Sequence, residues 1–329
     1  MQYLLDNFFS LTITGTTLGA VYALVALGYT LVYGVLRLIN FAHSEVFMYG
    51  TFASLWVVVL LGGKGGGSVG QVIFWVAMMF VAAMVISGLI AVLLERVAYR
   101  PLRKRNAPPL IALISAIGAS FVLSELMGLR QQVTGWVGLD TTLRTYVANS
   151  RNNSGMPEII TPQPVFTLGD YQVTNVDILV VVGAIAIMVV LDQFVKRSRL
   201  GRGIRAVAMD PESAALMGVN RDRVIQVTFL VGGVMAGAAA VFYMLKIGIT
   251  RYDAGFILGV KAFTAAVLGG IGNLRGALLG GFVLGLAENY GSAVVGTQWK
   301  DVVAFVLLVL ILLFRPTGLL GESLGKARA

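Results

Sequence analysis

The chain has 329 residues, of which 57% are hydrophobic and only 12% charged, and its mean hydropathy is +0.83. A soluble domain carries about 25% charged residues, so this composition excludes an ordinary soluble protein and indicates a protein embedded in a lipid bilayer. With no cysteine and a single histidine, the sequence offers no disulfide, no thiol nucleophile and no multi-histidine metal site.

Hydrophobic segments near the ~20 residues that a helix needs to cross a bilayer follow one another along the chain. They lie at residues 11–35, 42–62, 71–94, 108–128, 176–195, 224–247, 258–290 and 301–315. Because these segments take up most of the chain, we predict an all-α integral membrane protein. It is a polytopic helical bundle of about eight spans, forming a single transmembrane domain over residues 1–329.

Basic residues predict how the spans are oriented. The net charge of +9 is concentrated in short stretches between spans, at 96–105 and 196–223. Such stretches are typical of cytoplasmic loops and do not indicate a nucleic-acid partner. We therefore expect 196–223 to be a cytoplasmic loop and the hydrophilic segment 129–175, rich in Asn, Thr and Pro, to be an extracytoplasmic loop. The side on which the N-terminus lies stays open.

A glycine-rich break interrupts the long apolar segment 258–290, and it contains Gly269, Gly270, Gly272 and Asn273. A single crossing there would place the basic C-terminus outside, against the charge rule. We predict two half-length helices joined by a turn, either as a re-entrant hairpin or as two short spans. Irregular backbone at membrane depth is tolerated only where protein or a wet cavity covers it. The four residues are therefore candidates for a translocation path or a subunit interface.

A polar run at 40–45 (Asn-Phe-Ala-His-Ser-Glu) separates two apolar stretches and holds the single histidine. Ionisable groups near hydrocarbon are costly and usually functional. If the segment is unwound, Asn40, His43 and Glu45 can point into one cavity and hold a zwitterion or an amide. Alternatively, the run is an interfacial turn at which Arg37, His43 and Glu45 meet lipid headgroups. The residues alone leave both interpretations open.

A short helix is predicted within the stretch 196–223. Asp210 is a helix cap, Pro211 suits the first helical position, and Glu212 adds negative charge to the first turn. Gly218 can end the helix two turns later. The small residues Ser213, Ala214 and Ala215 let a groove of another protein close around it, although an ordinary capped loop helix would look the same.

Two motifs resemble known families. The spacing of Glu212, Ser213, Ala214 and Gly218 resembles the EAA-xxx-G coupling motif of binding-protein-dependent ABC importer permeases, with Ser213 in place of one alanine. Residues 18–45 closely resemble the branched-chain amino-acid permeases of the LivHM family, in particular the first, LivH-type, permease subunit. The family usually has Gly at the position of Ser44. Residues 95–103, 269–276 and 314–319 also agree, so the resemblance spans nearly the whole chain except 140–172, which resembles a longer external insert.

The resemblance implies a permease subunit of an ABC importer in the bacterial cytoplasmic (inner) membrane. It would move branched-chain or other neutral amino acids, with urea or short amides as the alternative. The implied partners are a second homologous permease, expected to form a heterodimer, two cytoplasmic ATPases that bind ATP and Mg, and an extracytoplasmic solute-binding protein. No phosphate-binding Gly-xxxx-Gly-Lys-Ser/Thr motif is present in the sequence, so we expect this chain to be no enzyme and to bind no cofactor itself.

The residues also bear on two other classes of protein. An ion-coupled secondary transporter or a channel would also use a broken helix and intramembrane polar groups, but a coupled carrier should bury more carboxylates than this chain offers. An intramembrane enzyme would need a catalytic arrangement that the sequence does not display. Within the importer interpretation, we expect a path lined by small and apolar side chains from 19–34, 40–50 and 262–276.

Overall fold

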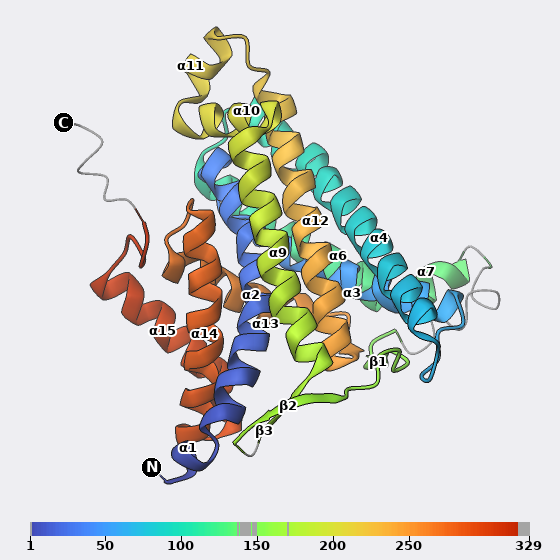
Figure 1. Ribbon diagram of the computed structural model, residues 1–329. Coiled ribbons are helices and arrows are strands. Elements are labelled where there is room, and N and C mark those ends of the chain that lie inside the picture. The colour runs from blue at the N-terminus through green and yellow to red at the C-terminus, as the bar shows by residue number, and fades with distance from the viewer. Residues whose placement is uncertain (1, 137, 139–145, 147–149, 170, 322–329) are drawn as a thin grey trace.

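The computed structural model describes residues 2–136, 138, 146, 150–169 and 171–321. The rest of the predicted extracytoplasmic segment 129–175, namely 137, 139–145, 147–149 and 170, lies outside the described residues, as do residues 1 and 322–329 at the ends of the predicted domain. Over the described part, eight helices are long and apolar enough to cross a membrane, which confirms the prediction of a polytopic helical bundle (Figure 1).

The spanning helices lie close to the predicted segments. They are α2 (Phe8–Leu36), α3 (His43–Leu60), α4 (Val69–Leu94), α6 (Pro109–Gly128), α9 (Asn175–Arg197), α12 (Arg221–Ile247), α14 (Leu274–Val295) and α15 (Lys300–Phe314). The last of these forms one span of 18 residues together with the 3-10 turn before it, η2 (Thr297–Trp299). A short helix, α1 (Gln2–Asp6), leads into α2.

The fourth helix continues past its predicted end at residue 94. A π-helical turn, η1 (Glu95–Tyr99), and a further helix, α5 (Arg100–Lys104), extend it. The cytoplasmic loop expected at 96–105 is therefore mostly helical, because charged residues do not by themselves end a helix. The chain turns only where Asn106 adopts a left-handed φ of 50° and Pro108 follows. A proline at 101 is tolerated because it lies in the first turn of α5, directly after the π-turn changes the hydrogen-bonding register.

The break in segment 258–290 is confirmed, but its two arms differ in length. α13 (Ala254–Gly269) has 16 residues and is too short to cross alone, whereas α14 has 22 and can cross. The expectation of two half-length helices is therefore wrong for α14. Gly270 and Gly272 have φ of 101° and 98°, which residues with a side chain rarely adopt, so the turn needs its glycines.

The two hydrophilic segments lie at opposite ends of the bundle in Figure 1. Segment 196–223 is almost entirely helical, with α10 (Arg199–Met209) and α11 (Pro211–Leu216) between α9 and α12. At the other end, the described part of 129–175 contains α7 (Arg130–Trp136), β1 (Ser154–Gly155), β2 (Pro164–Leu168) and β3 (Tyr171–Thr174). β2 pairs with β3, and β1 pairs with β4 (Ile249–Thr250) at the end of α12.

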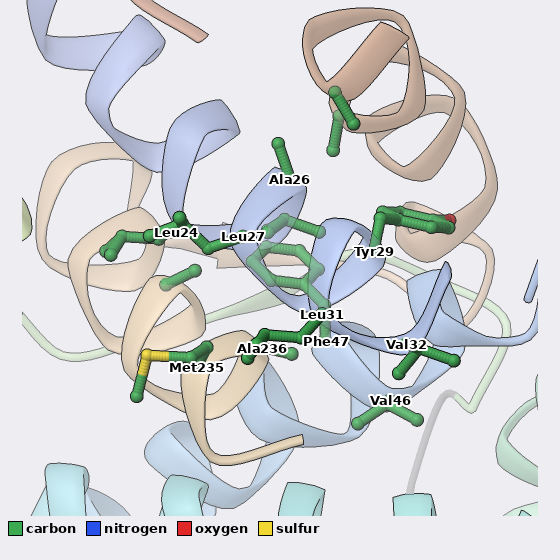
Figure 2. Close-up of a cluster of buried hydrophobic side chains, with 14 of the residues drawn as sticks. Leu24, Ala26, Leu27, Tyr29, Leu31, Val32, Val46, Phe47, Met235 and Ala236 are labelled. Atoms are coloured by element: carbon green, nitrogen blue, oxygen red, sulfur yellow. The ribbon is translucent and has the colours of Figure 1, made fainter. Parts of the chain in front are cut away.

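The core of the bundle surrounds α2. Figure 2 shows Leu24 and Leu27 of α2 in one cluster with Phe47 of α3 and Met235 of α12. By contrast, most of α15 and the outward faces of α4, α6 and α9 expose large apolar side chains, as expected for surfaces that meet lipid or a partner subunit.

Small residues allow α2 and α14 to approach closely. A Cβ built on Gly19 would lie 2.8 Å from the carbonyl oxygen of Gly281, and one built on Gly281 would lie 2.5 Å from Cα of Ala23. Backbone-to-backbone approach of this kind is how helices associate in a bilayer, where no hydrophobic effect drives them together.

Candidate functional site

A non-helical segment at 37–42 brings the polar run into the protein. α2 ends where Arg37 adopts a left-handed φ of 53°, and the next helix begins at His43. The imidazole of His43 contacts α2 at Gly28, about two turns before the end of that helix. Asn40, His43 and Glu45 are each at most 2% exposed. The alternative in which His43 and Glu45 meet lipid headgroups is therefore wrong, and only Arg37 is exposed.

His43 packs against α2 in the space that is open because Gly28 has no side chain. A Cβ built on Gly28 would overlap the imidazole at Nε2, so only glycine fits there. The ring of Tyr29 packs edge-on against His43, with centroids 4.9 Å apart. Nε2 of His43 has no hydrogen-bond partner among the described residues.

Asn40 and Glu45 contact different helices. The hydroxyl of Tyr99, in η1, donates to Oδ1 of Asn40 over 2.9 Å. On Glu45, Oε1 accepts from the hydroxyl of Ser120 in α6 over 3.1 Å, while Oε2 faces Gly255 in the first turn of α13. A helix N-terminus favours a carboxylate nearby. The three polar side chains thus diverge onto separate helices and do not meet in one cavity.

The glycine turn lies at the other end of α13 from these polar residues. Gly272 and Asn273 line a cavity of about 710 Å³ with Thr30 of α2, Asp192 of α9 and Arg205 of α10. Gly269 and Gly270 are not among the lining residues, and the carbonyl of Gly269 accepts from the amide of Leu320 over 3.0 Å. The structure therefore separates the predicted path residues into two groups along α13.

The helix α11 protrudes from the end of the bundle beside this cavity. Asp210 caps it by accepting from the Ser213 hydroxyl over 2.5 Å and from the Glu212 amide over 2.9 Å. The Ser213 hydroxyl contributes most, with the two backbone amides, to holding the pKa of Asp210 below its ordinary value.

The two sides of this short helix differ in exposure. Ala214 is buried against α10 and α12, whereas Leu216 and Met217 are 89% and 84% exposed. Gly218 follows with a left-handed φ of 83°. An apolar tip on a capped helix, with a small residue on its inner side, is a surface suited to the groove of another protein.

A network of charged side chains joins the same end of the bundle to η1. Arg103 of α5 forms ion pairs with the buried Glu95 over 3.1 Å and with Asp222 in the first turn of α12 over 2.7 Å. Arg100 reaches Asp222 over 3.5 Å. The start of α12, which directly follows α11, is thereby attached to the helix that holds Asn40.

Sequence reasoning missed a second polar cavity, which contains Lys261 and Glu288. Lys261 lies inside the apolar run of α13, and its Nζ is 2.5 Å from Oε1 of Glu288 in α14 and 2.6 Å from Asp301 in α15. A lysine within an apolar segment is itself a signal, because an unpaired charge there is costly. Its partners could not be found from spacing, since they come from separate helices.

This geometry, with apolar helices facing outward and a capped helix at one end, defines a multi-pass membrane protein with the features of a transport permease. A family profile described as "Branched-chain amino acid transport system / permease component" matches residues 11–312, and the chain belongs to that family. This membership sets aside the secondary-transporter and intramembrane-enzyme interpretations.

Individual relatives cover nearly the full chain. It is 41% identical over 313 residues to the high-affinity branched-chain amino acid transport system permease protein BraD of Pseudomonas aeruginosa, covering 94% of each chain. It is also 41% identical over 322 residues to LivH of Escherichia coli K12, described in the same terms, covering 97% of this chain and 96% of LivH. No solved structure matches.

Proposed function

We propose that this chain carries branched-chain amino acids inward across the bacterial cytoplasmic (inner) membrane as one permease subunit of an ABC importer. Its family membership and the names of BraD and LivH support the substrate class. The observation that carries the mechanism is α11, a capped helix with exposed Leu216 and Met217 at the end of the bundle.

In this proposal the energy comes from other subunits. Two cytoplasmic ATPases bind ATP and Mg, and each binds one permease at a helix such as α11. The second permease is a homologous chain, and a solute-binding protein delivers the amino acid at the opposite end, beside β1–β4. ATP-driven closure of the ATPases moves α11 and exposes the path alternately to the two sides.

The candidate path residues have two roles in this proposal. Gly272 and Asn273, with Gly269 and Gly270 just before them in the chain, form the inward end of the path, since the first two border the cavity beside α10. Asn40, His43 and Glu45 hold the start of α3 against three neighbouring helices. Through Tyr99, Arg103 and Asp222 this joint is connected to the segment that follows α11.

Reconstitution of the complete transporter tests the proposal. Liposomes containing both permeases and both ATPases should take up leucine, isoleucine and valine only with ATP and the loaded binding protein. Leu216→Asp should abolish uptake while the binding protein still binds leucine, because a charge would be buried in the ATPase groove. Leu5→Asp changes another exposed leucine, at the other end of the bundle, and is the control.

Other outcomes would change the assignment. Uptake of urea or a short amide in place of leucine would move the substrate to the alternative class. Uptake driven by an ion gradient without ATPases, or normal coupled ATP hydrolysis in the Leu216→Asp transporter, would overturn the importer mechanism.

A further inference from the structure

A second cavity, of about 460 Å³, is lined by residues of β4 and of the start of α13. β4 pairs with β1, which lies at the end of the bundle opposite α11 (Figure 1). The cavity lies between α2, the end of α12, the start of α13 and α14. Its volume falls in the range of small-molecule sites, roughly 300–1,000 Å³. This end is the one at which a delivered solute would enter.

Both signs of charge line the cavity. Arg251, Lys261 and Lys300 supply cations, and Asp253 and Glu288 supply carboxylates. Most of these charges are already paired: Arg251 binds Asp253 over 2.7 Å, and Lys261 binds Glu288 and, from outside the lining, Asp301. A lining of mixed sign offers little to a simple anion or cation and suits a ligand that carries both charges.

One acceptor and one cation are left over. Oε2 of Glu288 is fully buried and has no hydrogen-bond partner of ordinary geometry among the described residues, although the Tyr22 hydroxyl interacts with the same carboxylate. Lys300 forms no ion pair with any described residue, and it lines the same cavity. An unsatisfied buried carboxylate oxygen is costly and marks a place where a ligand can donate.

Apolar side chains complete the cavity beside these charges. Leu18 of α2, Ile247 at the end of α12, and Ile257 and Leu258 of α13 line it together with Tyr22. A branched aliphatic group can be buried there while polar groups at the other side are satisfied.

We propose that this cavity binds the zwitterionic end of an amino acid, with Glu288 accepting from the α-ammonium group and Lys300 binding the α-carboxylate. The inference rests on the proposed function and assigns the substrate its first contact within this chain. A zwitterion must give up strong hydration on entering a membrane protein, and paired opposite charges compensate both of its ends.

Photolabelling of the complete transporter tests this assignment. The probe is a leucine analogue with a diazirine in its side chain, applied to transporter in nanodiscs and followed by mass spectrometry of the peptides. We expect labelling of the peptides around Tyr22 and Ile257. L-leucine should compete, whereas 4-methylpentanoate, which lacks the amino group, and 3-methylbutylamine, which lacks the carboxylate, should not.

Two variants and two controls separate binding from folding. Glu288→Gln and Lys300→Gln should each raise the leucine concentration needed for half-maximal competition about tenfold, the loss expected for one charged hydrogen bond. Glu125→Gln and Lys64→Gln remove exposed charges outside the cavity and should leave it unchanged. Glu288→Gln also removes a partner of Lys261 and can prevent assembly. If it does, the result for Lys300→Gln tests the binding site.

The headgroup of phosphatidylethanolamine carries the same two charges, so the lipid is varied as well. Labelling that persists equally in phosphatidylglycerol and phosphatidylethanolamine nanodiscs supports an amino-acid site. Labelling displaced by phosphatidylethanolamine would reassign the cavity to lipid. If wild-type uptake of leucine is normal but both variants compete like wild type, the inference is overturned while the proposed function stands.

Discussion

The hydroxyl of Tyr99 donates a 2.9 Å hydrogen bond to Oδ1 of Asn40, and this bond joins the π-helical turn η1 to the non-helical segment before α3. Both side chains are almost completely buried. Single π-turns inside α-helices occur frequently at functional sites, because they redirect side chains that a regular helix would place elsewhere. Here the turn directs Tyr99 inward, while Arg103, one turn later, reaches Asp222 at the start of α12.

Removing the Tyr99 hydroxyl should destabilise this junction. Tyr99→Phe leaves the amide oxygen of Asn40 buried without its partner, at a cost of about 1–3 kcal/mol. Thermal unfolding of the purified transporter, followed by intrinsic fluorescence, should show a lower midpoint than wild type. Tyr33→Phe removes a hydroxyl that makes no hydrogen bond with another described residue, and it serves as the control. Equal midpoints for the two variants would contradict this role of the Tyr99–Asn40 bond.

The contact between Gly28 and His43 predicts a coupled pair of mutations. Gly28→Ala places a methyl group where the imidazole lies, and such overpacking costs about 1–3 kcal/mol. In a His43→Ala background the same change should cost much less, because the obstructing ring is gone. Unfolding midpoints of wild type, both single variants and the double variant give the coupling free energy. An additive result would show that Gly28 is needed for another reason.

The α2–α14 interface should not tolerate a side chain at Gly281. Gly281→Ala forces Cβ against Ala23 of α2, and the helices must move apart, so we expect loss of assembled protein in membranes. Gly118→Ala in α6 provides the matched control, since nothing described lies within 4 Å of its added Cβ. Because alanine is favoured over glycine in a helix, the control should be as stable as wild type or slightly more so. Membrane levels measured by immunoblotting decide between these outcomes.

Acid should loosen α11 through its cap. The pKa of Asp210 is lowered, chiefly by the Ser213 hydroxyl, so its charged form is stabilised when the helix is folded. The contribution is present above the ordinary pKa of an aspartate and is lost as the pH falls through the lower pKa in the folded helix. Amide hydrogen exchange in residues 212–216, corrected for the intrinsic effect of pH, should therefore rise in this acidic window.

The variant Asp210→Asn separates the effect of titrating the side chain from its effect as a helix cap. Asparagine caps a helix about as well as aspartate but does not ionise. The variant should keep α11 folded and show no added exchange at low pH. A pH response identical to that of wild type would assign the loosening to another group.

The spans were predictable from sequence because each crossing of the bilayer needs a run of roughly 20 mostly apolar residues. α6 begins and ends within a residue of its predicted bounds, since Pro108 and Pro109 begin it. Asp210, Pro211 and Gly218 were likewise sufficient to predict α11, because caps act over a single turn. The continuation through η1 was not foreseen, since a π-turn depends on which tertiary contacts its side chains gain and leaves no periodic signal.

The arrangement of the polar residues depended on long-range packing. Asn40, His43 and Glu45 are close in sequence, but their directions are set by Tyr99, Gly28 and Ser120 on other helices. The Lys261–Glu288 pair shows the converse, in which residues 27 positions apart meet because the turn at 270–273 folds α14 back along α13. Periodicity cannot predict either arrangement.

The segment between Leu36 and His43 also sets how this family can vary in length. Each residue added to or removed from a helix turns its side chains by about 100°. Since Asn40 is enclosed on all sides, an inserted residue would either bulge into occupied space or rotate α3, carrying Glu45 away from Ser120. Insertions should therefore accumulate among related permeases at the β1–β3 end of the bundle and be absent next to Asn40.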